Sequence, residues 1–188
     1  MLQTTGGSGD QAAMLEHLVH QLQPEAAPQP LSLRLTVNDR PVEAEVEPRT
    51  ILLDFLRDRL GLTGAKRSCD LQVCGACTVL VDGTPVSSCC TLAYEANGKA
   101  VETIEGLARY GELHPIQEAF VRSAALQCGF CTPGMILASK ALLAENPHPS
   151  REEIKAYLSG NLCRCTGYWN IIEAVEMAAR LMAGEKTE

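Results

Sequence analysis

The sequence has 188 residues, of which 46% are hydrophobic and 4% aromatic, so it has room for one medium-sized domain or two small ones around an aliphatic core. Its formal net charge of −7 argues against a nucleic-acid partner, because neutralising phosphates requires clustered Lys and Arg. No apolar run approaches the roughly 18 residues that a membrane span needs.

The N-terminal sequence "MLQTTGGSGDQAAMLEH" has neither the basic nor the apolar segment of a secretory signal, so we expect a cytoplasmic protein. Thiols stay reduced in the cytoplasm, where nine cysteines point to metal binding rather than to disulfides. Four disulfides with one spare cysteine are the alternative.

Residues 1–30 are expected to form a flexible N-terminal extension. "TTGGSGD" has a flexible composition, "QAAMLEHLVHQLQ" could form a short helix, and "PEAAPQP" is typical of a linker. His17 and His20 have the spacing of some metal-binding pairs. Because no third ligand lies nearby in the sequence, we interpret them as solvated helix residues.

Residues 31–108 have the pattern of a compact α+β sheet domain. Apolar and polar residues alternate through "LSLRLTVNDRPVEAEVEP" on both sides of a turn near Asn38, which predicts a β-hairpin. "TILLDFLRDRLGL" has the apolar spacing of a helix. Beyond a cysteine-rich loop, "CTVLVDGTPVSSC" predicts a second hairpin around Asp82-Gly83. Asn97-Gly98 predicts a turn between two further strand segments, "TLAYEA" and "KAVETIEGL".

Residues 109–184 are predicted to form a second, helical domain, followed by a tail at residues 185–188. Four amphipathic segments with short connections predict a small four-helix bundle: "HPIQEAFVRSAAL", "TPGMILASKALLAEN", "SREEIKAYLSGN" and "NIIEAVEMAARLMAG". Thr132, Ser150 and Asn170 are predicted N-caps of the last three helices, and the latter two are followed by Glu in the capping-box position.

Three cysteines lie within nine residues of the loop "RSCDLQVCGACTV", and a fourth follows after eleven more residues. Cys69, Cys74, Cys77 and Cys89 have the spacing of plant-type ferredoxins, in which four thiolates surround a [2Fe–2S] cluster. Small residues between Cys74 and Cys77 leave space for backbone N–H groups to approach the sulfurs. Structural zinc is the alternative, although its sites usually contain two C-x2-C knuckles and this set contains one.

The ninth cysteine, Cys90, directly follows Cys89. Successive side chains of a strand point to opposite faces. We therefore expect Cys90 to be a small buried side chain and not a ligand.

A second set of four cysteines is divided between "LQCGFCTPGM" and "NLCRCTGYWN". Cys128, Cys131, Cys163 and Cys165 lie at boundaries of predicted helices, so both segments can meet at one end of the bundle and form another four-thiolate site. A C-x-C pair is uncommon in zinc modules. This favours a second iron–sulfur cluster, with zinc as the alternative.

Together, "TGAKRSCDLQVCGACTV", "LQCGFCTPGM" and "LCRCTGY", in this order and at these separations, resemble the iron–sulfur subunit of the molybdenum hydroxylases. That family includes xanthine dehydrogenase, aldehyde oxidoreductase, aerobic carbon monoxide dehydrogenase and bacterial N-heterocycle hydroxylases. The resemblance extends over approximately residues 31–182. One departure is Gln72, where relatives often have glycine.

The resemblance implies an α+β protein with an N-terminal β-grasp, plant-type ferredoxin-like domain and an all-α four-helix domain, each holding one [2Fe–2S] cluster. The first set of four cysteines named above would bind one cluster, and the second set would bind the other. In the family the helical-domain cluster is nearer the molybdopterin of a large subunit, and residues matching Gln127 and Cys165 lie against the pterin. The ferredoxin-like cluster faces the FAD of a medium subunit. A helix cap is the alternative role for Gln127.

We therefore expect the electron-transfer subunit of a heterotrimer, or of a dimer of heterotrimers, that passes electrons from molybdopterin through both clusters to FAD. No phosphate-binding Gly-rich loop and no general-base constellation is recognisable, so no substrate-converting site is expected on this chain. We interpret Lys66 and Arg67 as solvating the first cysteine loop.

Two other functions are compatible with the sequence. One is a free-standing two-cluster carrier of the ferredoxin type, and the other is a zinc-stapled interaction module. In the molybdenum hydroxylases another polypeptide selects the substrate, so purines, aldehydes, carbon monoxide and N-heteroaromatics all stay open.

Overall fold

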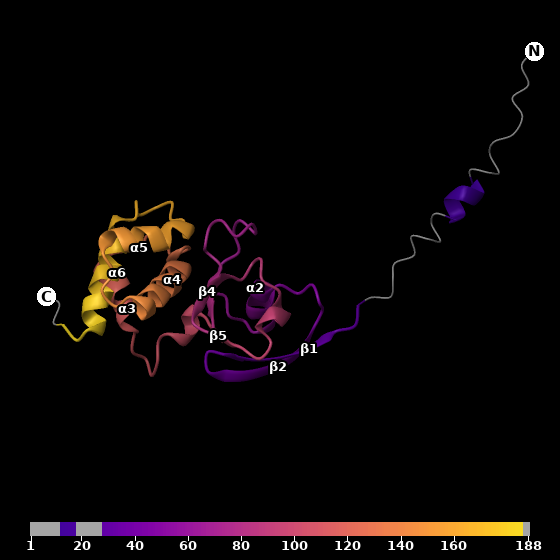
Figure 1. The fold of residues 1–188 in the computed structure, drawn as a ribbon, viewed down its shortest axis with the longest axis horizontal. Helices are drawn as coiled ribbons and strands as arrows, with labels where there is room; N and C mark the ends of the chain where they lie inside the picture. The colour runs from indigo at the N-terminus through magenta and orange to yellow at the C-terminus, as the bar shows by residue number, and fades with distance from the viewer. Residues whose placement is uncertain (1–11, 18–27, 186–188) are drawn as a thin grey trace, which may run out of the picture.

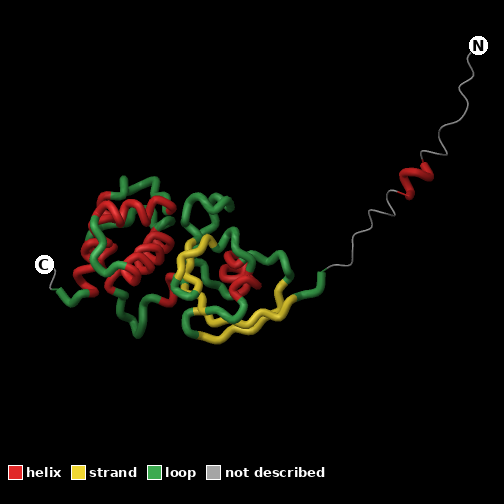
Figure 2. Tube along the Cα trace, viewed as in Figure 1, coloured by secondary structure: helices red, strands yellow, loops and turns green. Residues whose placement is uncertain are grey.

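The computed structural model describes residues 12–17 and 28–185. Residues 12–17 form a short helix with exposed side chains, whereas most of the predicted extension, His20 included, and the end of the predicted tail lie outside the described residues. From residue 28 onward, a sheet-containing part and a helical part lie side by side (Figure 1; Figure 2). None of the described helices is long and apolar enough to cross a membrane.

The first part is built on a five-stranded sheet with the order β2-β1-β5-β3-β4. Strands β1 and β5 pair in parallel, and the other neighbouring strands pair antiparallel. A parallel pair requires a long crossover connection, and here that connection contains the helical segment, the cysteine loop and the second hairpin. The strands are β1 (Leu31–Val37), β2 (Arg40–Val46), β3 (Thr78–Val81), β4 (Thr84–Ser87) and β5 (Ala100–Glu102).

Both predicted hairpins are confirmed, and their turn residues explain them. Asn38 and Asp39 have φ angles of 51° and 63°, and Asp82 and Gly83 have φ angles of 48° and 81°. Two consecutive residues with positive φ give the two-residue turn whose twist matches that of the flanking strands. In β1, alternate residues from Leu33 onward are buried, as the alternation of the sequence predicts.

The helix predicted from "TILLDFLRDRLGL" is present but irregular. A short α-helical segment, α2 (Leu52–Asp54), continues into a π-helical turn, η1 (Phe55–Arg59), in which Leu60 N–H donates to the Phe55 carbonyl at 3.2 Å. Leu52, Leu53, Phe55 and Leu56 are fully buried against the sheet.

The prediction of a strand in "TLAYEA" is wrong. This segment forms a 3-10 turn, η2 (Ala93–Ala96), which directs Ala93 and Ala96 into the core together. The Glu95 carboxylate accepts a hydrogen bond from the Leu92 N–H at 2.7 Å, so a local side-chain contact stabilises the turn.

The second part contains the four predicted helices: α3 (Pro115–Arg122), α4 (Thr132–Glu145), α5 (Arg151–Tyr157) and α6 (Trp169–Met182). Short 3-10 turns, η3 (Ile104–Gly106) and η4 (Leu158–Gly160), precede α3 and follow α5. The Ser150 capping box is confirmed, because Ser150 Oγ accepts from Glu153 N–H and the Glu153 carboxylate accepts from Ser150 N–H.

The other two predicted caps are wrong. Helix α4 has Cys131 as its N-cap, so Thr132 is already helical. Helix α6 has Tyr168 as its N-cap, and the Asn170 side chain instead donates to the Ala124 carbonyl at 3.3 Å. In both cases the helix begins beside a cysteine segment whose backbone path, rather than a capping side chain, determines the start.

Strand β3 joins the two hydrophobic cores. All four of its residues are buried. Val79 and Val81 belong to the core under the sheet, whereas Leu80 points the other way and packs with Ile116, Met135 and other buried residues of the helical part. Strand β3 therefore has apolar side chains on both faces of the sheet, and α4 covers the face on which Leu80 lies.

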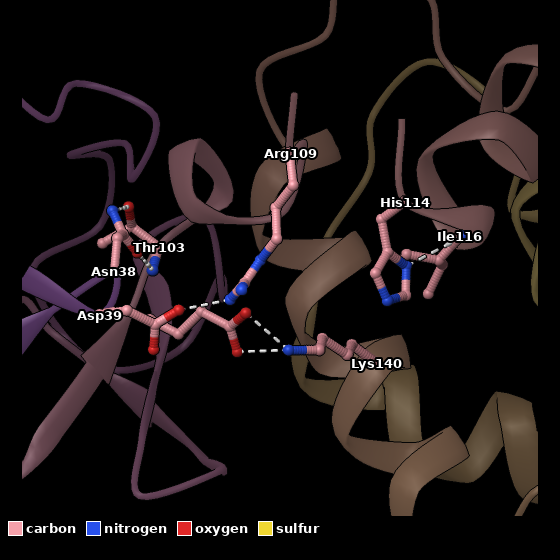
Figure 3. A network of polar contacts seen from close by, with 8 residues as sticks. Asn38, Asp39, Thr103, Arg109, His114, Ile116 and Lys140 are labelled. Atoms are coloured by element: carbon pink, nitrogen blue, oxygen red, sulfur yellow. Dashed lines mark hydrogen bonds and ion pairs between the residues drawn. The ribbon is translucent and has the colours of Figure 1, made fainter. Parts of the chain in front are cut away.

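Polar contacts surround this apolar interface (Figure 3). Lys140 on α4 forms a half-buried ion pair with Glu102 on β5, with an N–O distance of 2.6 Å. Arg109 pairs with Asp39 at the β1–β2 turn, and Asn38 exchanges hydrogen bonds of 2.8 and 2.9 Å with Thr103. These contacts fix the connecting segment between the two parts.

The loop that carries Cys74 also rests directly on the helical part. The buried Asn161 side chain donates to the Gly75 carbonyl at 3.1 Å, and Leu162 N–H donates to the Cys74 carbonyl at 2.9 Å. A Cβ atom at Gly134, in the first turn of α4, would collide with the Gly75 carbonyl oxygen. Gly134 is thus needed for close backbone approach, not for a special φ angle.

We expect Gly134→Ala to destabilise the protein by about 1–3 kcal/mol, because the added methyl group forces the two parts away from each other. Helix propensity alone predicts the opposite, a gain of about 1 kcal/mol. Urea unfolding of the anaerobically prepared full chain measures the difference. Gly160→Ala is the matched control: nothing lies within 4 Å of its Cβ position, and it should be neutral or slightly stabilising. Equal stability of Gly134→Ala and the wild type would contradict the packing described above.

Candidate metal centres

Ion pairs hold the first cysteine loop in place. Arg67 contacts both Asp54, at the end of α2, and Asp70, with an N–O distance of 2.8 Å to the latter. Lys66 donates to the Thr63 carbonyl at 2.7 Å. Both basic residues therefore have partners within the chain, and Arg67 does more than solvate the loop because it fixes the segment that precedes Cys69.

The environment of Cys69 favours a thiolate. Backbone N–H groups of Leu71, Val73 and Cys74 hydrogen-bond to its sulfur and lower the pKa of the Cys69 thiol to about 6. The Leu71 N–H lies 3.4 Å from the sulfur. The Cys74 thiol also contacts Cys69, so these two sulfurs form a pair at the outer side of the loop.

Cys77 and Cys89 form the inner pair. Both are buried, and burial raises the pKa of the Cys77 thiol to about 12. Cys77 lies where the loop enters β3, and Cys89 lies in the turn after β4, so the second hairpin brings the two together. The first set thus combines an easily ionised outer thiol with a buried inner thiol that loses its proton only to a metal.

The expectation for Cys90 is wrong in one respect. Cys90 is exposed rather than buried, and its sulfur lies 3.6 Å from that of Cys89. Strand β4 ends at Ser87, so Cys89 and Cys90 lie in a turn and the alternation of strand side chains does not apply to them.

Gln72 occupies a backbone position that favours glycine. Its φ angle is 58°, in the left-handed region. Side chains other than Gly pay roughly 1–2 kcal/mol there. This explains physically why glycine is suited to this position of the first loop.

The second set of cysteines lines a cavity of about 450 Å³ between the two cysteine-bearing segments of the helical part. The Cys128 and Cys165 sulfurs are 3.6 Å apart. Cys131 and Cys163 interact as the other pair. Cys74 and Ala76 of the first loop also line this cavity, so the two sets are neighbours in space.

Cys131 and Cys163 of this set differ in how readily their thiols ionise. Burial raises the pKa of the Cys131 thiol to about 12. Burial also disfavours ionisation of Cys163, but hydrogen bonds from the Thr166 hydroxyl and N–H outweigh it and lower the pKa of the Cys163 thiol. The Thr166 N–H lies 3.4 Å from the sulfur, and the backbone N–H of Cys163 donates to the Tyr168 hydroxyl at 2.9 Å.

Gln127 does not cap a helix. Helix α3 ends at Arg122, and the Gln127 side chain donates to the carbonyl of Cys165 at 3.1 Å. Gln127 and Cys165 are both exposed, and this hydrogen bond ties together the two segments that carry the second set.

The arrangement of the sulfurs fits a two-iron cluster at each set. Each iron of a [2Fe–2S] cluster binds two protein thiolates, and each set consists of two sulfur pairs. Within residues 12–17 and 28–185, no three His, Cys, Asp or Glu side chains converge as ligands of a single ion. Paired sulfurs and surrounding backbone N–H groups are the donor set that a binuclear iron–sulfur cluster requires.

Comparison with known proteins identifies the family. Residues 35–106 match the family of the 2Fe-2S iron-sulfur cluster binding domain, and residues 103–176 match the [2Fe-2S] binding domain. The chain is 46% identical to the small FeS subunit of nicotinate dehydrogenase from Eubacterium barkeri, over 81% of this chain and 98% of that subunit. It is 50% identical to the small subunit of nicotine 6-hydroxylase from Paenarthrobacter nicotinovorans, over 77% of this chain and 87% of that subunit. The chain belongs to the iron–sulfur small subunits of the molybdenum hydroxylases.

Solved structures agree with this membership. Quinoline 2-oxidoreductase from Pseudomonas putida 86 matches with a TM-score of 0.79 and 48% identity, over 84% of this chain and 99% of that one. Aldehyde oxidoreductase from Desulfovibrio gigas matches with a TM-score of 0.80 and 42% identity, over 83% of this chain but 18% of that longer one. The predicted fold class is confirmed, and the protein is the iron–sulfur subunit of a multi-subunit oxidoreductase.

Cys74→Ala tests the first set. We expect it to remove one of two electron paramagnetic resonance signals of the reduced chain and to leave the other, because only one set loses a thiolate. Spectra of the dithionite-reduced full chain provide the measurement. Retention of both signals would show that Cys74 is not a ligand.

Gln72→Gly should retain the iron content and raise the thermal stability slightly. Relief of left-handed strain, about 1–2 kcal/mol, exceeds the loss of about 0.5–1 kcal/mol from the greater freedom of glycine in the unfolded chain. Gln72→Val, with a β-branched side chain at the same φ angle, should lower stability and weaken cluster retention. Indistinguishable melting temperatures for the two variants would contradict the conformational argument.

Proposed function

We propose that this subunit carries electrons from a molybdopterin centre on a large subunit, through two [2Fe–2S] clusters, to FAD on a medium subunit. In this proposal Cys69, Cys74, Cys77 and Cys89 hold the cluster of a domain at residues 31–108. Cys128, Cys131, Cys163 and Cys165 hold the cluster of a domain at residues 109–184. The clusters would supply one-electron chemistry, and this chain supplies the thiolates, the hydrogen bonds to sulfur and the exclusion of water.

The hydrogen bond between Leu162 N–H and the Cys74 carbonyl is the observation that carries the proposal. Cys74 belongs to the first set, and Leu162 directly precedes Cys163 of the second set. Backbone atoms and one hydrogen bond of 2.9 Å therefore connect a proposed ligand of one centre to a proposed ligand of the other. Two centres joined in this way suit electron transfer within the chain.

Exposed apolar side chains beside both centres support partner subunits at each end. Leu71 and Val73 project from the first loop, with exposed fractions of 73% and 58%. Phe130 and Leu162 are about half exposed at the cavity of the second set. Apolar groups in such positions are typical of protein interfaces. We assign the first surface to the flavin subunit and the second to the molybdopterin subunit.

Gln127 and Cys165 belong to this second surface. Their exposure and mutual hydrogen bond leave the Cys165 side of the centre open to a partner. We propose that these two residues lie against the pterin of the large subunit, within a heterotrimer or a dimer of heterotrimers in the cytoplasm.

A free two-cluster carrier is the competing function. It would use the same ligands but would bind its partners only transiently. The relatives are named for different substrates, among them nicotinate, nicotine and caffeine, although they share this type of subunit. We infer that a partner subunit, not this chain, selects the substrate.

Purification of the tagged chain from its native cells distinguishes the two functions. The relay predicts a stable complex that contains molybdenum and FAD, because apolar surfaces beside both centres require partners to cover them. A chain recovered alone, with both clusters but neither molybdenum nor flavin, would favour the carrier.

Two substitutions sharpen this test. Leu71→Ser should reduce co-purification of flavin, and Phe130→Ser should reduce that of molybdenum, each several-fold, with unchanged iron content. Met182→Ser is the control, because Met182 is an exposed apolar residue at the far end of α6 and should affect neither.

A further inference from the structure

Five thiols, not four, gather at the first centre. Cys90 follows the proposed ligand Cys89, is exposed, and has its sulfur 3.6 Å from the Cys89 sulfur. The backbone N–H of Gln72, in the middle of the first loop, hydrogen-bonds to the Cys90 sulfur. Cys90 therefore faces the loop that carries Cys69 and Cys74 rather than pointing away from it.

The distance between the Cys89 and Cys90 sulfurs has a direct meaning for metal binding. A metal–thiolate bond of about 2.3 Å in tetrahedral geometry separates two sulfurs on one ion by about 3.8 Å. The Cys89–Cys90 distance is close to this value and equals the 3.6 Å between Cys128 and Cys165, a pair proposed to share an iron. The Cys90 sulfur is thus close enough to bind the same metal ion as the Cys89 sulfur.

Cys89 and Cys90 lie in a turn beyond the end of β4. Strand β4 ends at Ser87, so residues 88–90 form a turn that makes no ladder with a neighbouring strand. The Cys90 N–H donates to the Ser87 carbonyl at 2.9 Å within this turn. Leu53 N–H donates to the Ser88 carbonyl at 3.0 Å and the Ser88 hydroxyl donates to the Cys77 carbonyl at 2.6 Å, so the turn is anchored and the exchange requires rotation of the two cysteine side chains.

We propose that Cys90 is a reserve ligand of the first centre, which replaces Cys89 on the same iron. In the exchange one iron–sulfur bond to Cys89 breaks and one to Cys90 forms, while the Cys90 proton moves to the Cys89 sulfur, so no electron is gained or lost. The inference rests on the proposed ligand role of the first cysteine set. It gives the first centre a second, more solvent-exposed ligation state.

The test compares four full-length chains prepared anaerobically: wild type, Cys89→Ala, Cys90→Ala and the double variant. Alanine is used because a serine oxygen can itself bind iron. The wild type and Cys90→Ala should contain about four irons per chain, as two [2Fe–2S] clusters require. Cys89→Ala should also retain about four, with altered g values for one paramagnetic signal. The double variant should retain about two irons and one signal.

The unaltered signal of the helical centre reports folding in every variant. Loss of the first cluster in Cys89→Ala, to the level of the double variant, would overturn the inference. Loss of that cluster in Cys90→Ala would do so as well, because Cys90 would then be a primary ligand. A wild-type chain with fewer than four irons would contradict the proposed function itself, before any variant is compared.

Discussion

The carbonyl groups of Cys74 and Gly75 hold the two halves of this protein together. Leu162 N–H and the Asn161 side chain donate to them at 2.9 and 3.1 Å, and Gly134 leaves space for the backbone to come this close. The contact is made by the loop of one cysteine set and by residues adjacent to the other set. The distance between the two proposed metal centres is therefore fixed by one backbone hydrogen bond and by one from the buried Asn161 side chain.

Both centres distribute charge in the same way. Each has a thiol whose ionisation is favoured by hydrogen bonds, Cys69 in one and Cys163 in the other, and a thiol whose pKa is raised to about 12 by burial, Cys77 or Cys131. The thiols that ionise readily are available for initial metal binding, and the thiols with a raised pKa become ligands only when a metal replaces their protons. Burial of Cys77 and Cys89 excludes water from one side of the first centre, while the exposed Cys128 and Cys165 leave the second centre open to a partner subunit.

Local signals in the sequence predicted much of this structure. Asn38-Asp39 and Asp82-Gly83 determine their turns through backbone conformation, and the spacing of the cysteines indicates which of them can gather in one loop. The caps at Thr132 and Asn170 were not predictable, because the segments containing Cys131 and Tyr168 fix where those helices begin. The proximity of Gly75 and Gly134 depends on contacts between residues distant in sequence. The orientation of Cys90 depends on where β4 ends, a boundary that alternation alone does not define.

Native mass spectrometry of the anaerobically purified full chain tests the central claim most directly, because it weighs the intact metal centres without disturbing them. Two [2Fe–2S] clusters predict a mass increase over the bare polypeptide that corresponds to two Fe2S2 units, with collisional activation removing them in two steps. A mass increase that corresponds to zinc ions, or to a single Fe2S2 unit, would contradict the account.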